Sequence, residues 1–131
     1  MSEHLPKPIW QDATTLCRDL QRGAVTATAV MANVYARIKA LNPHINALVE
    51  LLPEEQAMAL AAAADKVPVA ERGPLHGLPM APKDAVAVAG FATSWGFEPF
   101  SNRIESADDE LARRMRNAGA IFIGHSNMPE F

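Results

Sequence analysis

Lys83 is the residue whose type and setting most favour chemistry. It follows Pro82, precedes Asp84 and stands just ahead of a wholly apolar run at residues 85–89. A lysine drawn partly into the interior at that point would have a pKa below the usual value of about 10.4, because burial disfavours the charged form. Such an amine can accept and return a proton near neutral pH, which is the task of a general base. The spacing alone favours a simpler alternative, an exposed lysine in a polar loop, paired with Asp84.

Other kinds of site find little support in the residue pattern. The histidines have neither the i, i+3 or i, i+4 spacing of metal ligands nor a cysteine at a suitable distance. They are His4, His44, His76 and His125. The phosphate-loop, dinucleotide-binding and nucleophile-elbow motifs do not occur in the sequence. We therefore predict no metal and no cofactor.

The composition is that of one globular domain. The chain has 131 residues, a net charge of -3 and 49% hydrophobic residues, so it presents no basic field to attract nucleic acid or anionic lipid. One cysteine, Cys17, forms no internal disulfide and fits a reducing compartment. The N-terminus lacks the apolar region of a signal peptide, and the longest apolar run, residues 57–64, is too short to span a bilayer. These features predict a cytoplasmic protein that binds neither nucleic acid nor membranes.

Helices dominate the first half of the chain. The predicted elements are an extended arm at residues 1–11, a helix at 12–22, a second helix at 26–42, a strand at 45–52 and a third helix at 54–66. Asp12 and Thr26 are residue types that cap helix N-termini, and Gly23 suits a left-handed C-cap. Pro43 cannot continue a helical hydrogen-bond ladder, so the second helix is expected to end before it.

The second half has the pattern of an α/β layer. The predicted elements are a loop at residues 73–82, a buried strand at 85–89, a helix at 107–118 and a strand at 120–123. Ser106 and Asp109 have the spacing of a capping box, with Ser106 as the cap. Leu111 and Met115 lie on the face expected to be buried, and Gly119 suits the C-cap. A helix, a glycine and an apolar strand in this order favour a largely buried sheet.

Several segments, taken together, resemble the amidase signature family. They are G-P-L-H-G-L-P at residues 73–79, Lys83-Asp84, Gly90 with Thr93-Ser94 and Gly96, N-A-G-A-I at residues 117–121, and N-M-P-E-F at residues 127–131. The L-N-P and I-N-A triplets within residues 41–47 resemble the start of the same family. Each segment alone is unspecific, but their order and spacing are specific over about residues 10–131.

The resemblance implies a fold and a mechanism. The fold is α/β, with a mixed β-sheet core flanked by helices, and this chain would hold the N-terminal helical part and the first core strands. Family members are serine amide hydrolases or amidotransferase subunits with a Ser–cis-Ser–Lys triad. Lys83 matches the triad lysine at the end of the first core strand, where it would activate the serine nucleophile through the bridging cis-serine. Pro82 stands where the family commonly has valine or isoleucine, so the strand is expected to end early or bulge.

The resemblance also implies how the chain is organised. Residues 1–131 would be the N-terminal portion of a single amidase domain, with an arm at 1–11, a mainly helical part at 12–72 and the start of the α/β core at 73–131. Both triad serines would lie beyond Phe131, so the chain alone is expected to be inactive on the small-molecule amide substrate of the full-length protein. An incomplete sheet leaves edges uncovered, which favours marginal stability or self-association, for example as a homodimer.

Two alternatives stay open on the sequence. An amidotransferase subunit, which releases ammonia from glutamine, would share the same residues. A non-catalytic α/β interaction module would keep Lys83 as a structural residue.

Overall fold

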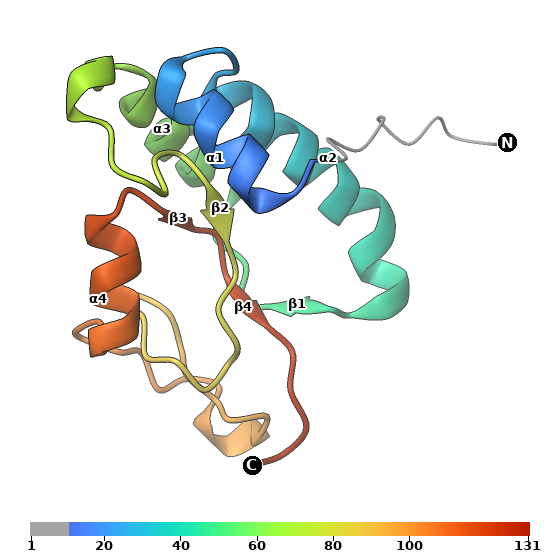
Figure 1. Cartoon of the computed structure of the whole chain (residues 1–131). Coiled ribbons are helices and arrows are strands. Elements are labelled where there is room, and N and C mark those ends of the chain that lie inside the picture. Colours follow the sequence, from blue (N-terminus) through green and yellow to red (C-terminus); the bar gives the residue numbers. More distant parts are fainter. Residues whose placement is uncertain (1–10) are drawn as a thin grey trace, which may run out of the picture.

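The computed structural model describes residues 11–131, so the predicted arm lies almost wholly outside the described residues. The helices are α1 (Ala13–Arg22), α2 (Ala27–Ile45), α3 (Glu54–Asp65) and α4 (Glu110–Asn117), with 3₁₀ turns at Val69–Glu71 and Glu98–Phe100. The strands are β1 (Leu48–Val49), β2 (Pro79–Met80), β3 (Ile121–Phe122) and β4 (His125–Ser126). Helices α1, α2 and α3 lie on one side of the strands and α4 lies on the other (Figure 1).

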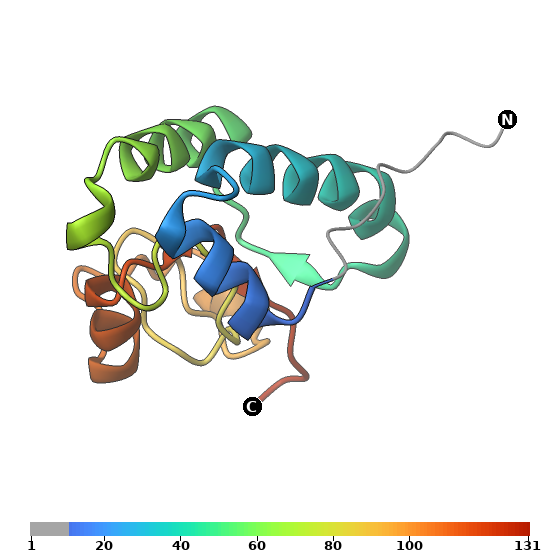
Figure 2. The same ribbon diagram turned by 45° about the horizontal axis from the view of Figure 1, so that its top comes forward.

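Local capping places the first two helices where the sequence predicts them. The Asp12 carboxylate accepts a hydrogen bond from the Thr15 N–H (2.8 Å), and Gly23 ends α1 with a φ of 76°. The Thr26 hydroxyl accepts a hydrogen bond from the Ala29 N–H and opens α2. Helices α2 and α3 pack against each other along the upper side of the molecule (Figure 2). No helix within residues 11–131 is long and apolar enough to cross a bilayer.

The predicted end of α2 is wrong, because the helix runs through Pro43 to Ile45. Proline removes one N–H from the ladder, but the Asn46 N–H still reaches the Asn42 carbonyl oxygen at 2.8 Å and closes the last turn. Asn46 then ends the helix in the left-handed conformation. Consequently, the strand predicted at residues 45–52 is reduced to β1.

A parallel pairing of residues 78–84 with residues 121–126 forms the centre of the described fold. In β2 and β3, Pro79 lies opposite Ile121 and Met80 opposite Phe122. The pairing resumes further along as an isolated parallel bridge between Lys83 and Ser126. Strand β2 ends before Pro82, as the missing proline N–H predicts. Strand β4, which follows β3 in the chain, pairs antiparallel with β1.

The strand predicted at residues 85–89 is absent. After Lys83 the chain turns, and the Val86 N–H donates to the Lys83 carbonyl oxygen (2.9 Å). Further on, the Ala89 N–H donates to the Asp108 carboxylate (2.8 Å), and the Ala87 carbonyl oxygen accepts from the Asp109 N–H (2.9 Å). These peptide groups therefore bind the segment that leads into α4 rather than a neighbouring strand.

Strand β3 divides two hydrophobic clusters. Successive strand residues point to opposite faces. Ile121 and Ile123 accordingly pack with buried residues of α1, α2 and α3, such as Met31. Phe122 packs on the other face with Val88 and with Ala112 of α4. The two clusters fix the strand pairing that carries Lys83, because a one-residue slip would exchange the two faces.

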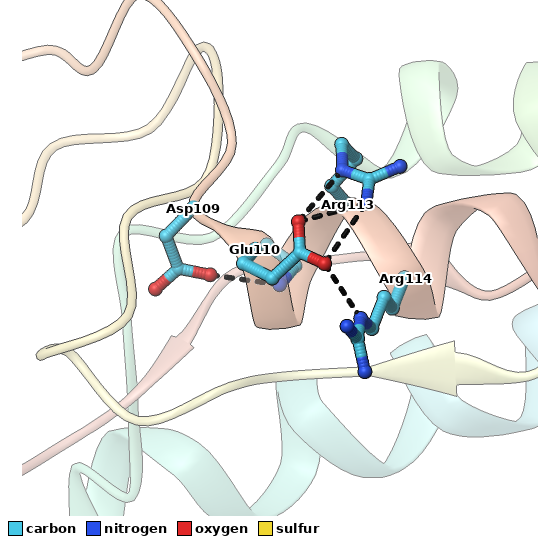
Figure 3. Close-up of polar contacts among 5 residues, drawn as sticks. Asp109, Glu110, Arg113 and Arg114 are labelled. Atoms are coloured by element: carbon cyan, nitrogen blue, oxygen red, sulfur yellow. Dashed lines mark hydrogen bonds and ion pairs between the residues drawn. The ribbon is translucent and has the colours of Figure 1, made fainter.

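Helix α4 differs from its predicted form at the N-terminus. Asp109 is the cap, and its carboxylate accepts a hydrogen bond from the Ala112 N–H (2.8 Å), so the prediction of Ser106 as the cap is wrong. A helix that begins at Glu110 buries Ala112, and Leu111 is exposed rather than buried. Glu110 forms ion pairs with Arg113 and Arg114 on the outer face (Figure 3).

Candidate active site around Lys83 and Asp84

Lys83 lies where the parallel pairing of residues 78–84 with residues 121–126 ends. The backbone fixes it on both sides, because the Ser126 N–H donates to the Pro82 carbonyl oxygen (2.8 Å) and the Asp84 N–H donates to the Ser126 carbonyl oxygen (3.0 Å). These two hydrogen bonds flank Lys83 and leave its backbone little freedom. The end of a paired strand is a position from which a fold can present a side chain accurately.

The Lys83 side chain is exposed, which corrects the expectation that the fold draws it partly into the interior. Within residues 11–131 the structure gives its amine no hydrogen bond and no ion pair, so the alternative of a pair with Asp84 is not seen either. The physical reason is that Asp84 points inward to other partners, and no described segment covers Lys83.

Asp84 is buried and is the centre of a polar cluster. One carboxylate oxygen accepts a hydrogen bond from the Ser94 N–H (2.8 Å), and the other accepts one from the Ser94 hydroxyl. Its Oδ1 atom also lies 3.5 Å from Nδ1 of His125. A buried carboxylate requires such donors, because an unpaired buried charge is very unfavourable. Asp84 thereby ties the end of the first paired segment to residue 94 and to β4.

The loop after Ser94 has an unusual backbone. Trp95 has a φ of 57°, a left-handed conformation that is unfavourable for a bulky side chain. The Trp95 N–H donates to the Asp84 carbonyl oxygen (3.0 Å), and the Trp95 carbonyl oxygen accepts from the Phe131 N–H (2.8 Å). Strained backbone held by such bonds occurs often at functional sites.

A surface pocket of about 380 Å³ adjoins this loop. Its lining includes Asn46, Val49, Glu50, Asp84, Ala92, Ser94, Gly96, Glu98, Ser101 and Asn127. Three of these residues are acidic, so the pocket favours cationic or hydrogen-bond-donating groups over anions. Lys83 itself does not line the pocket, although it is adjacent in sequence to Asp84.

The structure brings together segments that the family resemblance singles out. Residues 83–84 meet Ser94 through Asp84, and residues 73–79 meet the end of α4, where the Leu75 N–H donates to the Ala118 carbonyl oxygen (2.9 Å). The sequence does not reveal the contact of His125 with Asp84, because it joins residues far apart in the chain. A signal that could have indicated it is the acidic residue directly before the apolar run at residues 85–89.

Two other titratable residues show no sign of a chemical role. Burial raises the pKa of the Cys17 thiol, which disfavours the reactive thiolate. Burial, followed by the charge of Arg72, lowers the pKa of His76. The Nε2 atom of His76 is buried and has no hydrogen-bond partner among the described residues.

Comparison with solved structures defines the class of protein. The native peptide amidase from Stenotrophomonas maltophilia superposes with a TM-score of 0.82 at 32% sequence identity, over 95% of this chain and 26% of that one. The fold is therefore the amidase-signature fold predicted from the sequence, with its helical part and first core strands.

Sequence comparison then gives the family. The amidase family model matches residues 29–131, so the chain belongs to the amidase family. An acylamidase from Rhodococcus erythropolis is 31% identical over 92% of this chain and 26% of its own length. A subunit of the glutamyl-tRNA(Gln) amidotransferase of Alkalilimnicola ehrlichii is 37% identical over 86% of this chain and 23% of its own length. The chain thus spans about a quarter of the length of these relatives.

Proposed function

We propose that this chain supplies the lysine of a Ser–cis-Ser–Lys amidase that hydrolyses C–N amide bonds as part of a longer polypeptide. The observation that carries the proposal is the position of Lys83. Lys83 lies next to the end of the paired segment 78–84, in the region that matches the amidase family. Its backbone is fixed by the hydrogen bonds that Ser126 forms with Pro82 and Asp84. Its side chain is exposed to solvent, where a further segment can meet it.

The proposed chemistry begins with a proton transfer. The serine nucleophile gives its proton to the cis-serine, which passes its own proton to the neutral Lys83 amine while the serine oxygen bonds to the substrate carbonyl carbon. The C–N bond then breaks, and the leaving amine takes the proton back from Lys83 through the cis-serine. Water then attacks the acyl ester and gives a proton through the cis-serine to Lys83. The C–O bond to the nucleophilic serine breaks, the serine oxygen takes that proton back, and the carboxylic acid is released.

Lys83 can accept a proton only if its amine is neutral, which requires withdrawal from water. Residues 11–131 leave it exposed, and none of the serines of this chain matches the triad positions. We therefore expect the 131-residue chain alone to hydrolyse no amide, because triad residues act as a unit.

The first test is the reading frame that encodes this chain. We expect it to continue past Phe131 into a Gly-Gly-Ser-Ser-Gly-type stretch. In that longer polypeptide, Lys83→Met should lower kcat for simple amides by about 10⁴-fold or more. Lys66→Met is the matched control, since Lys66 is exposed at the C-cap of α3. Full turnover by the Lys83→Met protein would refute the role of Lys83.

A second candidate is an amidotransferase subunit, which the 37% identity to a glutamyl-tRNA(Gln) amidotransferase component favours. Such a subunit would use the same Lys83 chemistry on the side-chain amide of glutamine and pass the ammonia to a partner protein. Release of ammonia from glutamine by the longer polypeptide, at a higher rate than from simple amides, would support this candidate. The reverse preference would support the amidase.

A further inference from the structure

Both ring nitrogens of His125 face backbone carbonyl oxygens. Its side chain is fully buried on β4. The Nδ1 atom lies 3.0 Å from the Ala92 carbonyl oxygen, and the Nε2 atom lies 3.0 Å from the Val86 carbonyl oxygen. Both neighbours are backbone acceptors, and neither can donate a proton.

A neutral imidazole does not satisfy this arrangement. It carries one N–H donor and one lone pair. If Nδ1 holds the proton, the Nε2 lone pair faces the Val86 oxygen at 3.0 Å. If Nε2 holds it, the Nδ1 lone pair faces the Ala92 oxygen and also Asp84. The doubly protonated imidazolium alone donates to both carbonyl oxygens.

A buried cation needs an opposite charge, and Asp84 supplies it. Its Oδ1 atom lies 3.5 Å from Nδ1 of His125, and both groups are buried. Both carboxylate oxygens accept hydrogen bonds from Ser94, which suits the ionised form. Charged side chains on the adjoining segments include Lys83, Glu50, Glu98, and Arg103 and Glu105 beside the strand-like segment at Ala92. Within residues 11–131 the carboxylate of Asp84 is the one that the structure pairs with His125.

We propose that the His125 imidazolium and the Asp84 carboxylate form a buried charge pair that positions the Lys83 segment. Asp84 transmits the constraint through its backbone, because its N–H donates to the Ser126 carbonyl oxygen. This hydrogen bond fixes the chain on one side of Lys83, and the hydrogen bond from the Ser126 N–H to the Pro82 carbonyl oxygen fixes it on the other. Both are positioning residues in this proposal, since they act through the backbone that flanks Lys83. Their part in catalysis rests on the proposed function, but the charge pair itself does not.

The direct test is nuclear magnetic resonance of the ring nitrogens in the ¹⁵N-labelled 131-residue chain at about pH 8, where an ordinary histidine is neutral. We expect both nitrogens of His125 to carry protons. His76 is the internal reference and should be neutral, because burial lowers its pKa. A single protonated nitrogen on His125, or a spectrum in which His125 matches unfolded histidine, would overturn the proposal.

Substitutions then separate charge from packing. Asp84→Asn keeps the side-chain shape but removes the charge, so His125 should lose one ring proton under the same conditions. The N–H groups of residues 84 and 126 should exchange with solvent about tenfold faster or more. His125→Lys retains a cation and should restore slow exchange relative to His125→Gln. His44→Gln is the control, since His44 is exposed on α2.

The outcomes distinguish this proposal from the proposed function. Double protonation of His125 that persists in Asp84→Asn refutes the charge pair. Equal exchange rates of the residue 84 and 126 N–H groups in His125→Lys and His125→Gln refute it as well. None of these measurements depends on amide hydrolysis. A charge pair that is present in a longer polypeptide without amidase activity would refute the proposed function alone.

Discussion

The tight contact between residues 73–79 and the turn after α4 makes Gly119 a sharp test of the fold. Gly119 has a φ of 102°, and a Cβ atom there would lie 2.7 Å from the His76 Cα atom. The left-handed backbone disfavours alanine by about 1–2 kcal/mol. The contact with backbone adds about 1–3 kcal/mol, because neither chain can shift without losing the hydrogen bond from the Gly77 N–H to the Gly119 carbonyl oxygen. Gly119→Ala should therefore lower the free energy of unfolding by about 3 kcal/mol.

Two other glycines separate the two contributions in urea unfolding of the 131-residue chain. Gly90 has a φ of 87° but no atom within 4 Å of a Cβ, so Gly90→Ala should show the backbone cost alone. Gly73 does not have a left-handed φ, but its Cβ would lie 2.4 Å from the Ala118 oxygen, so Gly73→Ala should show the steric cost alone. If Gly119→Ala is no more destabilising than Gly90→Ala, the packing of residues 73–79 against this turn is not as described.

Two further predictions concern carboxylates at helix ends. Burial raises the pKa of Asp65, but hydrogen bonds from Thr28 and the Ala27 N–H outweigh burial, and the pKa is lowered overall. The stabilisation that the Asp65 carboxylate gives the folded state is thus complete above the unfolded pKa of 3.8 and is lost as pH falls through the folded pKa. The free energy of unfolding in urea should therefore depend less on pH between about 5 and 3 in Asp65→Asn than in the parent chain. An equal pH dependence of the two proteins would contradict this. Asp109→Ala should cost about 1 kcal/mol in urea unfolding because it removes the α4 cap, whereas Ser106→Ala should change stability by less than about 0.5 kcal/mol. The opposite order would restore Ser106 as the cap.

Features set by neighbours in sequence were predictable, and features set by distant partners were not. The caps at Asp12 and Thr26 depend only on the next three residues, so the pattern located them. The run at residues 85–89 has the composition of a strand, but the Asp108 carboxylate and the Asp109 N–H, much later in the chain, take its peptide groups. The position of Lys83 followed from the family resemblance, whereas its exposure depends on which segments cover it.

The positioning of Lys83 and its activation as a base are separate physical tasks. Positioning requires hydrogen bonds and a buried charge pair, and the groups for both lie within residues 82–126. Activation requires that water leave the amine, and the described residues do not provide that. If this division is correct, covering Lys83 should change its protonation without moving its backbone. The N–H groups of Asp84 and Ser126 should then be as protected from exchange in the 131-residue chain as in a longer polypeptide; markedly weaker protection in the short chain would show that the covering segments also set the position.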